Sequence, residues 1–366
     1  MKKNENKNVE RKWFLAIVVF LIIVGFLNLA TVSAPISLSK FGVTNHYLIH
    51  ALVYGLCPGV ILGVLFFLLP LKKIKKYTPI LFLSNLIVAS LVFIPQLGVK
   101  LQGARRWLSI GPITFQPSEF LKVSFILYLA YLLSVFTKKK EVRKSTIVFL
   151  IISAMIVALL VAQSDISTLI IILSTGVGMY FMSGISWRTF LIVLLAGLIL
   201  LGAVVLCAPY RVQRLATFFF PGEADSLNEK YQAQQLILAV GSGGLTGKGI
   251  GLSTQKFGFL PYSMSDSIFA IISEEVGLLG ASILILALIA FAVLGLKIAI
   301  HSSDLFYNLI GMGVIFWIMT QSVIHIAANL GAIPLTGVPL PFFSYGGSAL
   351  VVELIGVSLI LNVSKK

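Results

Sequence analysis

The sequence predicts an all-α polytopic membrane protein with ten transmembrane helices. Of its 366 residues, 58% are hydrophobic and only 11% are charged, and the mean hydropathy is +1.01. A soluble domain usually carries about twice that charged fraction, so the charges cannot cover the surface of soluble domains. The net charge of +15 is unusual, because a chain embedded in lipid should avoid charge.

Ten apolar runs are long enough to cross a bilayer, which takes about 20 residues. The fifth and sixth runs are divided only by the polar residues 163–165. We expect the ten runs to form a single integral membrane domain over residues 1–366. The expected spans are 13–33, 47–70, 78–98, 118–136, 146–162, 166–184, 188–208, 266–296, 306–330 and 344–363.

The basic residues in short loops predict that both termini are cytoplasmic. Lys and Arg cluster at 2–12, 72–76 and 138–144, which fall on one side of the membrane if the spans alternate. Residues 1–12 are then a cytoplasmic tail, and 209–265 is a large extracytoplasmic loop between the seventh and eighth spans. In this loop, residues 231–240 mix Gln with apolar residues, which predicts a helix resting on the membrane interface.

The short cytoplasmic loops leave no room for a nucleotide-binding domain, so we expect no nucleotide cofactor. The glycine-rich stretch 241–251 lacks the Ser or Thr that a P-loop needs directly after Lys248. We interpret its glycines as a flexible turn. The two cysteines and four histidines are scattered, so a zinc site built by the protein is not expected.

Several polar residues lie at the predicted outer rim of the fourth span. Glu119 and Lys122 share one helix face at i, i+3, either as a helix cap with a local ion pair or as part of a site. Arg105, Arg106 and Trp107 precede them. Two arginines near an interfacial lysine suit a lipid-linked phosphate or pyrophosphate, whereas the tryptophan could equally anchor the membrane interface.

Two aspartates lie at the predicted outer face. Asp165 is expected at the tip between the fifth and sixth spans, where an aspartate is either solvated, capping a helix or functional. Asp266 follows Pro261 and begins an apolar helix. It is either a first-turn acid favoured by the helix dipole or a partly desolvated carboxylate able to act as a general base.

Further polar groups inside the predicted spans need partners. Glu274, Glu275 and Glu353 are acidic residues of the eighth and tenth spans. The proline-rich segment 334–347 breaks the helix before the last span, and we expect it to shape a groove at the outer side. A polar stripe at i, i+4, i+8 in the ninth span is interpreted as interhelical hydrogen bonding; it consists of Gln321, His325 and Asn329.

Five stretches together resemble the SEDS family (shape, elongation, division and sporulation). They are GARRWLSIGPITFQPSEFLK at 103–122, YRVQRLATFFFP at 210–221, YQAQQLILAVGSGGLTGKGIGLSTQKFGFLP at 231–261, DSIFAIISEEVGLLG at 266–280 and GVPLPFFSYGGS at 337–348. The resemblance implies ten helices and a peptidoglycan glycosyltransferase that polymerises lipid II outside the bacterial cytoplasmic membrane. It also implies a class B penicillin-binding protein as the crosslinking partner.

The resemblance also assigns residues. The essential aspartate of the family corresponds to Asp266, and the acidic position after the fifth helix to Asp165. Trp107, Glu119 and Lys122 match the family's tryptophan and its fourth-helix pair. The chain departs from the family in two places: Pro261-Tyr-Ser-Met-Ser-Asp266 lacks the usual glutamate after the proline, and Gln-Pro-Asp-Leu-Gly becomes residues 163–167, Gln-Ser-Asp-Ile-Ser.

These residues suggest one reaction scheme. Asp266 would take a proton from the 4-hydroxyl of an incoming lipid II as this hydroxyl attacks the lipid-pyrophosphate-linked donor and inverts its anomeric carbon. Arg105, Arg106 and Lys122 would offset the charge of the leaving pyrophosphate. Glu119 would hold the lysine or help to bind a divalent cation such as Mg²⁺ or Mn²⁺, because hard cations prefer oxygen ligands.

Three alternatives stay open. The first is a role in elongation, although the stretches 114–119 and 210–221 resemble the division members of the family more than the elongation members. The division members act at the septum with other divisome proteins. Ten helices with acidic groups also suit a lipid flippase, although a carrier more often places such groups at the midplane. An inactive scaffold that only binds its penicillin-binding partner is the third reading.

Overall fold

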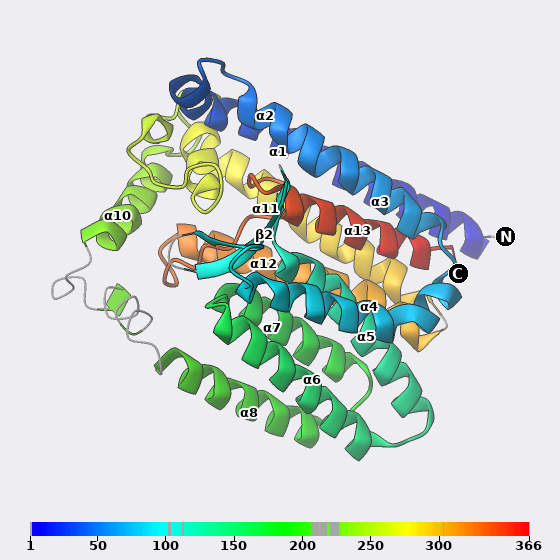
Figure 1. The fold of residues 1–366 in the computed structure, drawn as a ribbon. Helices are drawn as coiled ribbons and strands as arrows, with labels where there is room; N and C mark the ends of the chain where they lie inside the picture. The colour runs from blue at the N-terminus through cyan, green and yellow to red at the C-terminus, as the bar shows by residue number, and fades with distance from the viewer. Residues whose placement is uncertain are drawn as a thin grey trace.

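The protein is a bundle of long, roughly aligned helices with a small sheet at one end (Figure 1). The computed structural model describes residues 2–101, 104–111, 113–206, 212, 218–219, 227–302 and 304–365. The helices are α1 (Lys2–Phe41), α2 (His46–Ala51), α3 (Cys57–Leu68), α4 (Leu71–Ser90), α5 (Pro117–Lys138), α6 (Val142–Ala162), α7 (Ile166–Met182), α8 (Trp187–Leu206), α10 (Leu227–Ser242), α11 (Ile268–Ile300), α12 (Leu305–Asn329) and α13 (Gly347–Val363).

The chain is a multi-pass membrane protein. Eight helical segments of the described residues are long and apolar enough to cross a membrane, and two shorter apolar helices, Ile166–Met182 and Gly347–Val363, accompany them. One of the eight, His46–Leu68, runs through α2, a π-helical turn at Leu52–Leu56 and α3. Each shorter helix has 17 residues, which is near the lower limit for a span. Each of these ten segments overlaps one of the ten expected apolar runs.

The expectation of an all-helical chain misses a three-stranded antiparallel sheet. Its order is β1 (Gly98–Leu101), β2 (Ala104–Ile110) and β3 (Ile113–Phe115). Apolar, aromatic and β-branched residues favour strands here, and Gly111 takes a φ of +61° between β2 and β3, which a glycine adopts without steric cost. The sheet directly precedes α5 and carries the two arginines and the tryptophan on β2.

Two helices begin before the expected apolar runs. Helix α1 begins at Lys2, so residues 2–12, the expected cytoplasmic tail, are helical and continuous with the first span. Helix α4 begins at Leu71, so the lysines at 72–76 lie in its first turns. Lysine is a good helix former and carries its charge on a long stem away from the apolar surface, which lets both helices extend past the apolar run.

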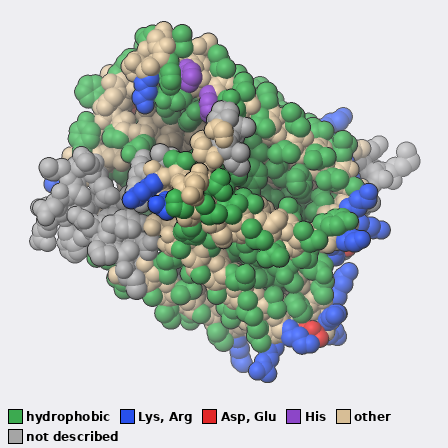
Figure 2. Space-filling view, in the orientation of Figure 1, with side chains coloured by type: hydrophobic (Ala, Val, Ile, Leu, Met, Phe, Trp, Pro, Cys, Tyr) green, Lys and Arg blue, Asp and Glu red, His purple; other side chains and the backbone are tan. Residues whose placement is uncertain are grey.

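The core of the bundle surrounds α12, which contacts α5, α7, α11 and α13. Helices α12 and α5 are the two most buried of the eight long segments. Both chain termini lie at the same end of the bundle (Figure 1). Figure 2 shows Lys and Arg side chains gathered at that end and a broad hydrophobic surface over the middle, as expected for a lipid-facing band between two polar ends.

The glycine-rich stretch 241–251, which was expected to be a flexible turn, packs closely against α11 at two of its glycines. A Cβ at Gly243 would overlap the carbonyl oxygen of Ser273, and one at Gly247 the carbonyl oxygen of Glu275. The stretch therefore needs glycine because it touches the backbone of α11. At the contact α11 is kinked, since Gly277 has φ +65° and ψ −168°.

Glu274 and Glu275 of α11 were expected to need partners. Both find them in the loop between α10 and α11. Glu274 is buried and accepts hydrogen bonds from Lys248 Nζ at 2.6 Å and from Thr254 Oγ1 at 2.9 Å. Glu275 pairs with Lys256 at 3.0 Å. These charge-assisted bonds fasten the loop to α11. The predicted interface helix is α10, which packs on α11. The 210–221 motif lies mostly outside the described residues.

Candidate functional site

The predicted pair on the fourth span is a buried ion pair. Lys122 Nζ lies 2.7 Å from Glu119 Oε2, and their side chains are only 2% and 6% exposed. The same Nζ donates to Gln321 Oε1 at 3.0 Å and lies 4.9 Å from the ring centroid of Trp317. A buried lysine of this kind is stable only when it is paired and hydrogen-bonded. It is therefore not placed to meet a pyrophosphate at the surface directly.

The polar stripe of α12 extends from this pair to the turn that carries Asp266. Gln321 Nε2 donates to the Pro339 carbonyl at 3.0 Å, and His325 Nδ1 lies 2.6 Å from the Val338 carbonyl. The carbonyl only accepts, so Nδ1 carries the hydrogen. Asn329 Nδ2 donates to the Asp266 carbonyl at 2.9 Å. Residues 321 and 329 are eight apart, or about 12 Å along a helix.

The proline-rich segment before the last span, which was expected to break the helix and shape an outer groove, lies along this stripe. Ser344 Oγ donates to the Ser265 carbonyl at 2.7 Å, and Tyr345 N donates to the Met264 carbonyl at 2.8 Å. The buried Glu353 of α13 accepts from Phe342 N at 2.9 Å. The segment is thus tied to α12, to α13 and to the turn of Asp266.

Asp266 is half-buried in the tight turn before α11. Its N–H donates to the Tyr262 carbonyl at 3.1 Å, and Tyr262 has a φ of +52°. The N-cap of α11 is Ser267, so Asp266 precedes the helix and is not its cap or a first-turn residue. A Cβ at Gly337 would lie 3.6 Å from Asp266 Oδ2, so the carboxylate faces the backbone of the broken segment.

Alternation along β2 separates the two arginines. Arg105 is exposed and Trp107 half-buried on one face, whereas Leu108 is buried on the other face, which also carries Arg106. Arg106 Nη2 donates to the Ser164 carbonyl and its Nη1 lies 3.9 Å from Asp165 Oδ1. Of the two arginines, Arg105 is the one whose side chain is presented to the outside.

Asp165 is buried and joins three parts of the fold. It caps α7 by accepting from Thr168 N at 3.3 Å, and its Oδ2 accepts from Ser118 Oγ and from Gln116 Nε2, both at 3.0 Å. The helix-capping interpretation of this residue is confirmed. The partners Gln116 and Ser118 were not singled out from the sequence, although they lie directly beside Glu119.

The seven predicted residues therefore form two clusters, and the remaining two, Arg105 and Trp107, lie on one face of β2. Glu119 and Lys122 form the buried pair, which the α12 stripe connects to Asp266. Arg106 and Asp165 form a structural link between β2 and α7. The sequence predicted only interhelical hydrogen bonding for the stripe, and the i, i+4, i+8 spacing was the signal that its members share one face of α12. These members are Gln321, His325 and Asn329.

The described residues fit a protein-bound divalent cation poorly. They contain no group of three or more His, Cys, Asp or Glu side chains placed to hold a metal ion. Glu119, the expected ligand, already pairs with Lys122.

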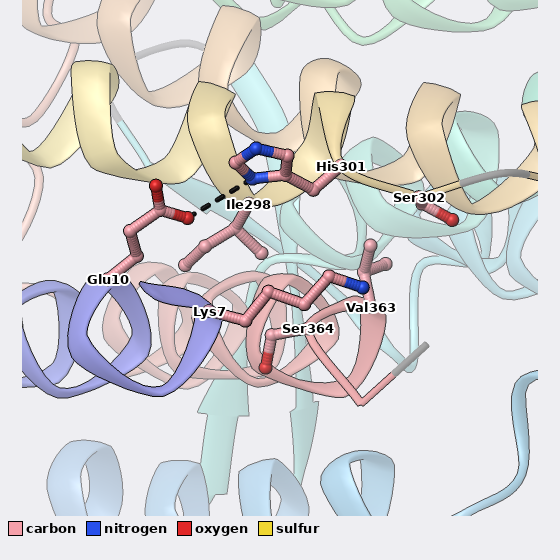
Figure 3. A pocket seen from close by; sticks show the side chains of 7 residues that line it. All are labelled: Lys7, Glu10, Ile298, His301, Ser302, Val363 and Ser364. Carbon is pink, nitrogen blue, oxygen red and sulfur yellow. Dashed lines mark ion pairs between the residues drawn. The ribbon is translucent and has the colours of Figure 1, made fainter. Parts of the chain in front are cut away.

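A small pocket lies at the opposite end of α11 from Asp266. Figure 3 shows the side chains that line it, among them Lys7 and the ion pair between Glu10 and His301 at 3.2 Å. Because His301 caps the far end of α11, this pocket is separate from the candidate site.

Replacing Asp165 by alanine is expected to lower the stability of the protein but not its catalytic rate. The variant loses a helix cap, worth about 1 kcal/mol, and leaves two donors unpaired, at about 1–3 kcal/mol each. The thermal unfolding temperature in detergent should fall by several degrees, and the activity per folded molecule should stay within a few-fold of the wild type. Normal unfolding with lost activity would instead assign Asp165 to substrate binding.

The fold and the site define a multi-pass membrane protein with a polar column that reaches from a buried ion pair to an aspartate at one end of the bundle. A profile of the cell cycle protein family of FtsW, RodA and SpoVE matches residues 11–366. The chain belongs to this family, which confirms the SEDS resemblance.

Named relatives cover most of the chain. The probable peptidoglycan glycosyltransferase FtsW of Coxiella burnetii is 34% identical over 360 residues, 96% of this chain and 95% of the relative. Stage V sporulation protein E of Bacillus subtilis is 36% identical over 294 residues, 80% of each chain.

Solved structures have the same fold. One, from work on the structural coordination of polymerization and crosslinking by a peptidoglycan synthase complex, matches with a TM-score of 0.79 at 25% identity over 96% of each chain. The rod shape determining protein RodA of Thermus thermophilus matches with a TM-score of 0.70 at 24% identity, over 96% of this chain and 95% of that one.

Proposed function

We propose that the protein is a peptidoglycan glycosyltransferase that polymerises lipid II into glycan strands at the outer face of the cytoplasmic membrane. The activity named for the relatives supports this, since one of them aligns over 96% of the chain. The observation that carries the proposal for the site is the half-buried Asp266 at the outer end of the α12 polar stripe. A carboxylate in that position can accept a proton from a sugar hydroxyl at the membrane surface.

The proposed topology has ten spans with both termini in the cytoplasm. The two 17-residue helices, α7 and α13, complete the count. The gathering of Lys and Arg at the end that holds both termini (Figure 2) supports a cytoplasmic location of that end. Asp266, at the opposite end of α11, would then face outward.

In the proposed reaction the 4-hydroxyl of lipid II attacks the anomeric carbon of the growing glycan. Asp266 takes the hydroxyl proton, the new glycosidic bond forms, and the bond to the lipid pyrophosphate breaks. Arg105 on the exposed face of β2 is the cation best placed to meet the departing pyrophosphate. Arg106 and Lys122 act less directly, because the first is bonded to the α6–α7 turn and the second is buried with Glu119.

We assign the protein to the division members of the family, with a class B penicillin-binding protein and other divisome proteins as partners at the septum. Several of the similar relatives are named FtsW, and a structural neighbour belongs to a peptidoglycan synthase complex. The alternative is an elongation role like that of RodA.

Purified full-length protein should produce glycan polymer from lipid II without added nucleotide. The assay is run in detergent and in vesicles, with and without the class B penicillin-binding protein of the same organism. Translocation of lipid II across vesicles without polymer would support a flippase instead. Binding of the partner without polymer or translocation would support a scaffold.

A further inference from the structure

We infer that Asn329 is a positioning residue for Asp266. This inference rests on the proposed function, in which Asp266 is the general base. Asn329 is the last residue of α12 and is 1% exposed. Its side chain reaches the turn before α11, where it contacts the backbone on both sides of the N-cap.

All three hydrogen bonds of this side chain are directional. Asn329 Nδ2 donates to the Asp266 carbonyl and to the His325 carbonyl, both at 2.9 Å, and Oδ1 accepts from Ala270 N at 3.2 Å. The two carbonyls can only accept and the N–H can only donate, so these partners fix which end of the amide is oxygen.

The bond to Ala270 replaces a missing helix cap. The first N–H groups of a helix lack intrahelical partners, and an N-cap side chain usually accepts from the third residue. In α11 the N-cap Ser267 makes no such bond, because its hydroxyl donates to the Pro261 carbonyl at 2.9 Å. Ala270 is the third residue of α11, so Asn329 caps this helix from another helix.

One amide therefore fixes both the start of α11 and the carbonyl of Asp266. On the other side of this turn, Ser344 holds the Ser265 carbonyl, and Gly337 faces the carboxylate with a φ of +68°. The turn of Asp266 is thus held from two directions, and Asn329 provides a side-chain hydrogen bond to the carbonyl of Asp266 itself. Displacing a reacting group by about 1 Å can cost about 100-fold in rate.

The test is the substitution Asn329→Leu, assayed for lipid II polymerisation with the full-length protein. We expect kcat to fall at least about tenfold while KM changes less than about threefold, because substrate contacts are kept and the base is displaced. The matched control is Asn308→Leu, the same change near the other end of α12, which should leave both constants unchanged. A kcat of Asn329→Leu within twofold of wild type overturns the inference.

A second variant covers the case in which Asn329→Leu does not fold. Asn329→Asp keeps an acceptor for Ala270 N, where the helix dipole favours a negative charge, but removes the donor to Asp266. It should fold and still lose kcat at least about tenfold, and wild-type kcat contradicts the inference. Asp266→Asn is measured in parallel: if it stays active the proposed base is wrong, whereas an inactive Asp266→Asn with fully active Asn329 variants refutes only the role of Asn329.

Discussion

Asp266→Asn should lose at least about 100-fold in kcat for lipid II polymerisation while the protein stays folded. Asparagine has nearly the same shape but cannot take the hydroxyl proton, and general base catalysis contributes about 10²- to 10⁴-fold. The backbone bonds of residue 266 to Tyr262 and Asn329 are kept in this variant. We therefore expect the fold around the turn to persist and lipid II binding to change little.

The matched control for this variant is Asp304→Asn. Asp304 caps α12 at its other end by accepting from Phe306 N at 2.9 Å, and asparagine is an equally good N-cap. This control should keep wild-type polymerisation. If Asp266→Asn also polymerised lipid II at the wild-type rate, Asp266 would not be the base, and the half-buried carboxylate would need another explanation.

Much of the fold could be predicted from the sequence because lipid leaves few choices. A backbone in hydrocarbon must satisfy its own hydrogen bonds, so each long apolar run had to be a helix. The sheet at 98–115 was missed because its residues sit outside the spans, where hydropathy carries no information on secondary structure. The packing of Gly243 and Gly247 against α11 was missed for a different reason, since close approach between distant segments leaves no local pattern.

The sequence predicted which residues belong to the candidate site better than it predicted how they contact one another. The spacing of Glu119 and Lys122 correctly placed them on one helix face. It did not reveal that Gln321 of a distant helix completes the pair, which required the tertiary structure. Asp165 was ambiguous for the same reason: its partner Ser118 lies 47 positions earlier in the sequence.

The structure also changes the meaning of the surplus positive charge. The lysines at the end that holds both termini fit the proposed orientation, whereas Lys122, Lys248 and Lys256 are each paired with a buried glutamate of a membrane helix. Such lysines hold segments together. The outward-facing charge near the candidate site is consequently smaller than the sequence indicated, and Arg105 is its main member.

Lys122→Met should destabilise the protein by about 3–5 kcal/mol, because it leaves the buried carboxylate of Glu119 without its partner. Replacing both members of a buried pair by apolar residues of similar volume is often neutral. The double variant Glu119→Met/Lys122→Met should therefore recover the unfolding temperature. The control is the exposed pair of Lys144 and Glu141, at 2.9 Å and with the same i, i+3 spacing, whose removal should change stability by less than about 1 kcal/mol.

The double variant separates stability from function. Lys122 fixes the Gln321 amide, which in turn holds the Pro339 carbonyl at the base of the broken segment. Because that segment is bonded to the turn of Asp266 through Ser344, we expect the stable double variant to polymerise lipid II at least about tenfold more slowly than wild type. Full activity in a stable double variant would mean that the pair serves the fold alone. If the double variant is stable but inactive, the pair of Glu119 and Lys122 is needed for the reaction at Asp266 as well as for the fold.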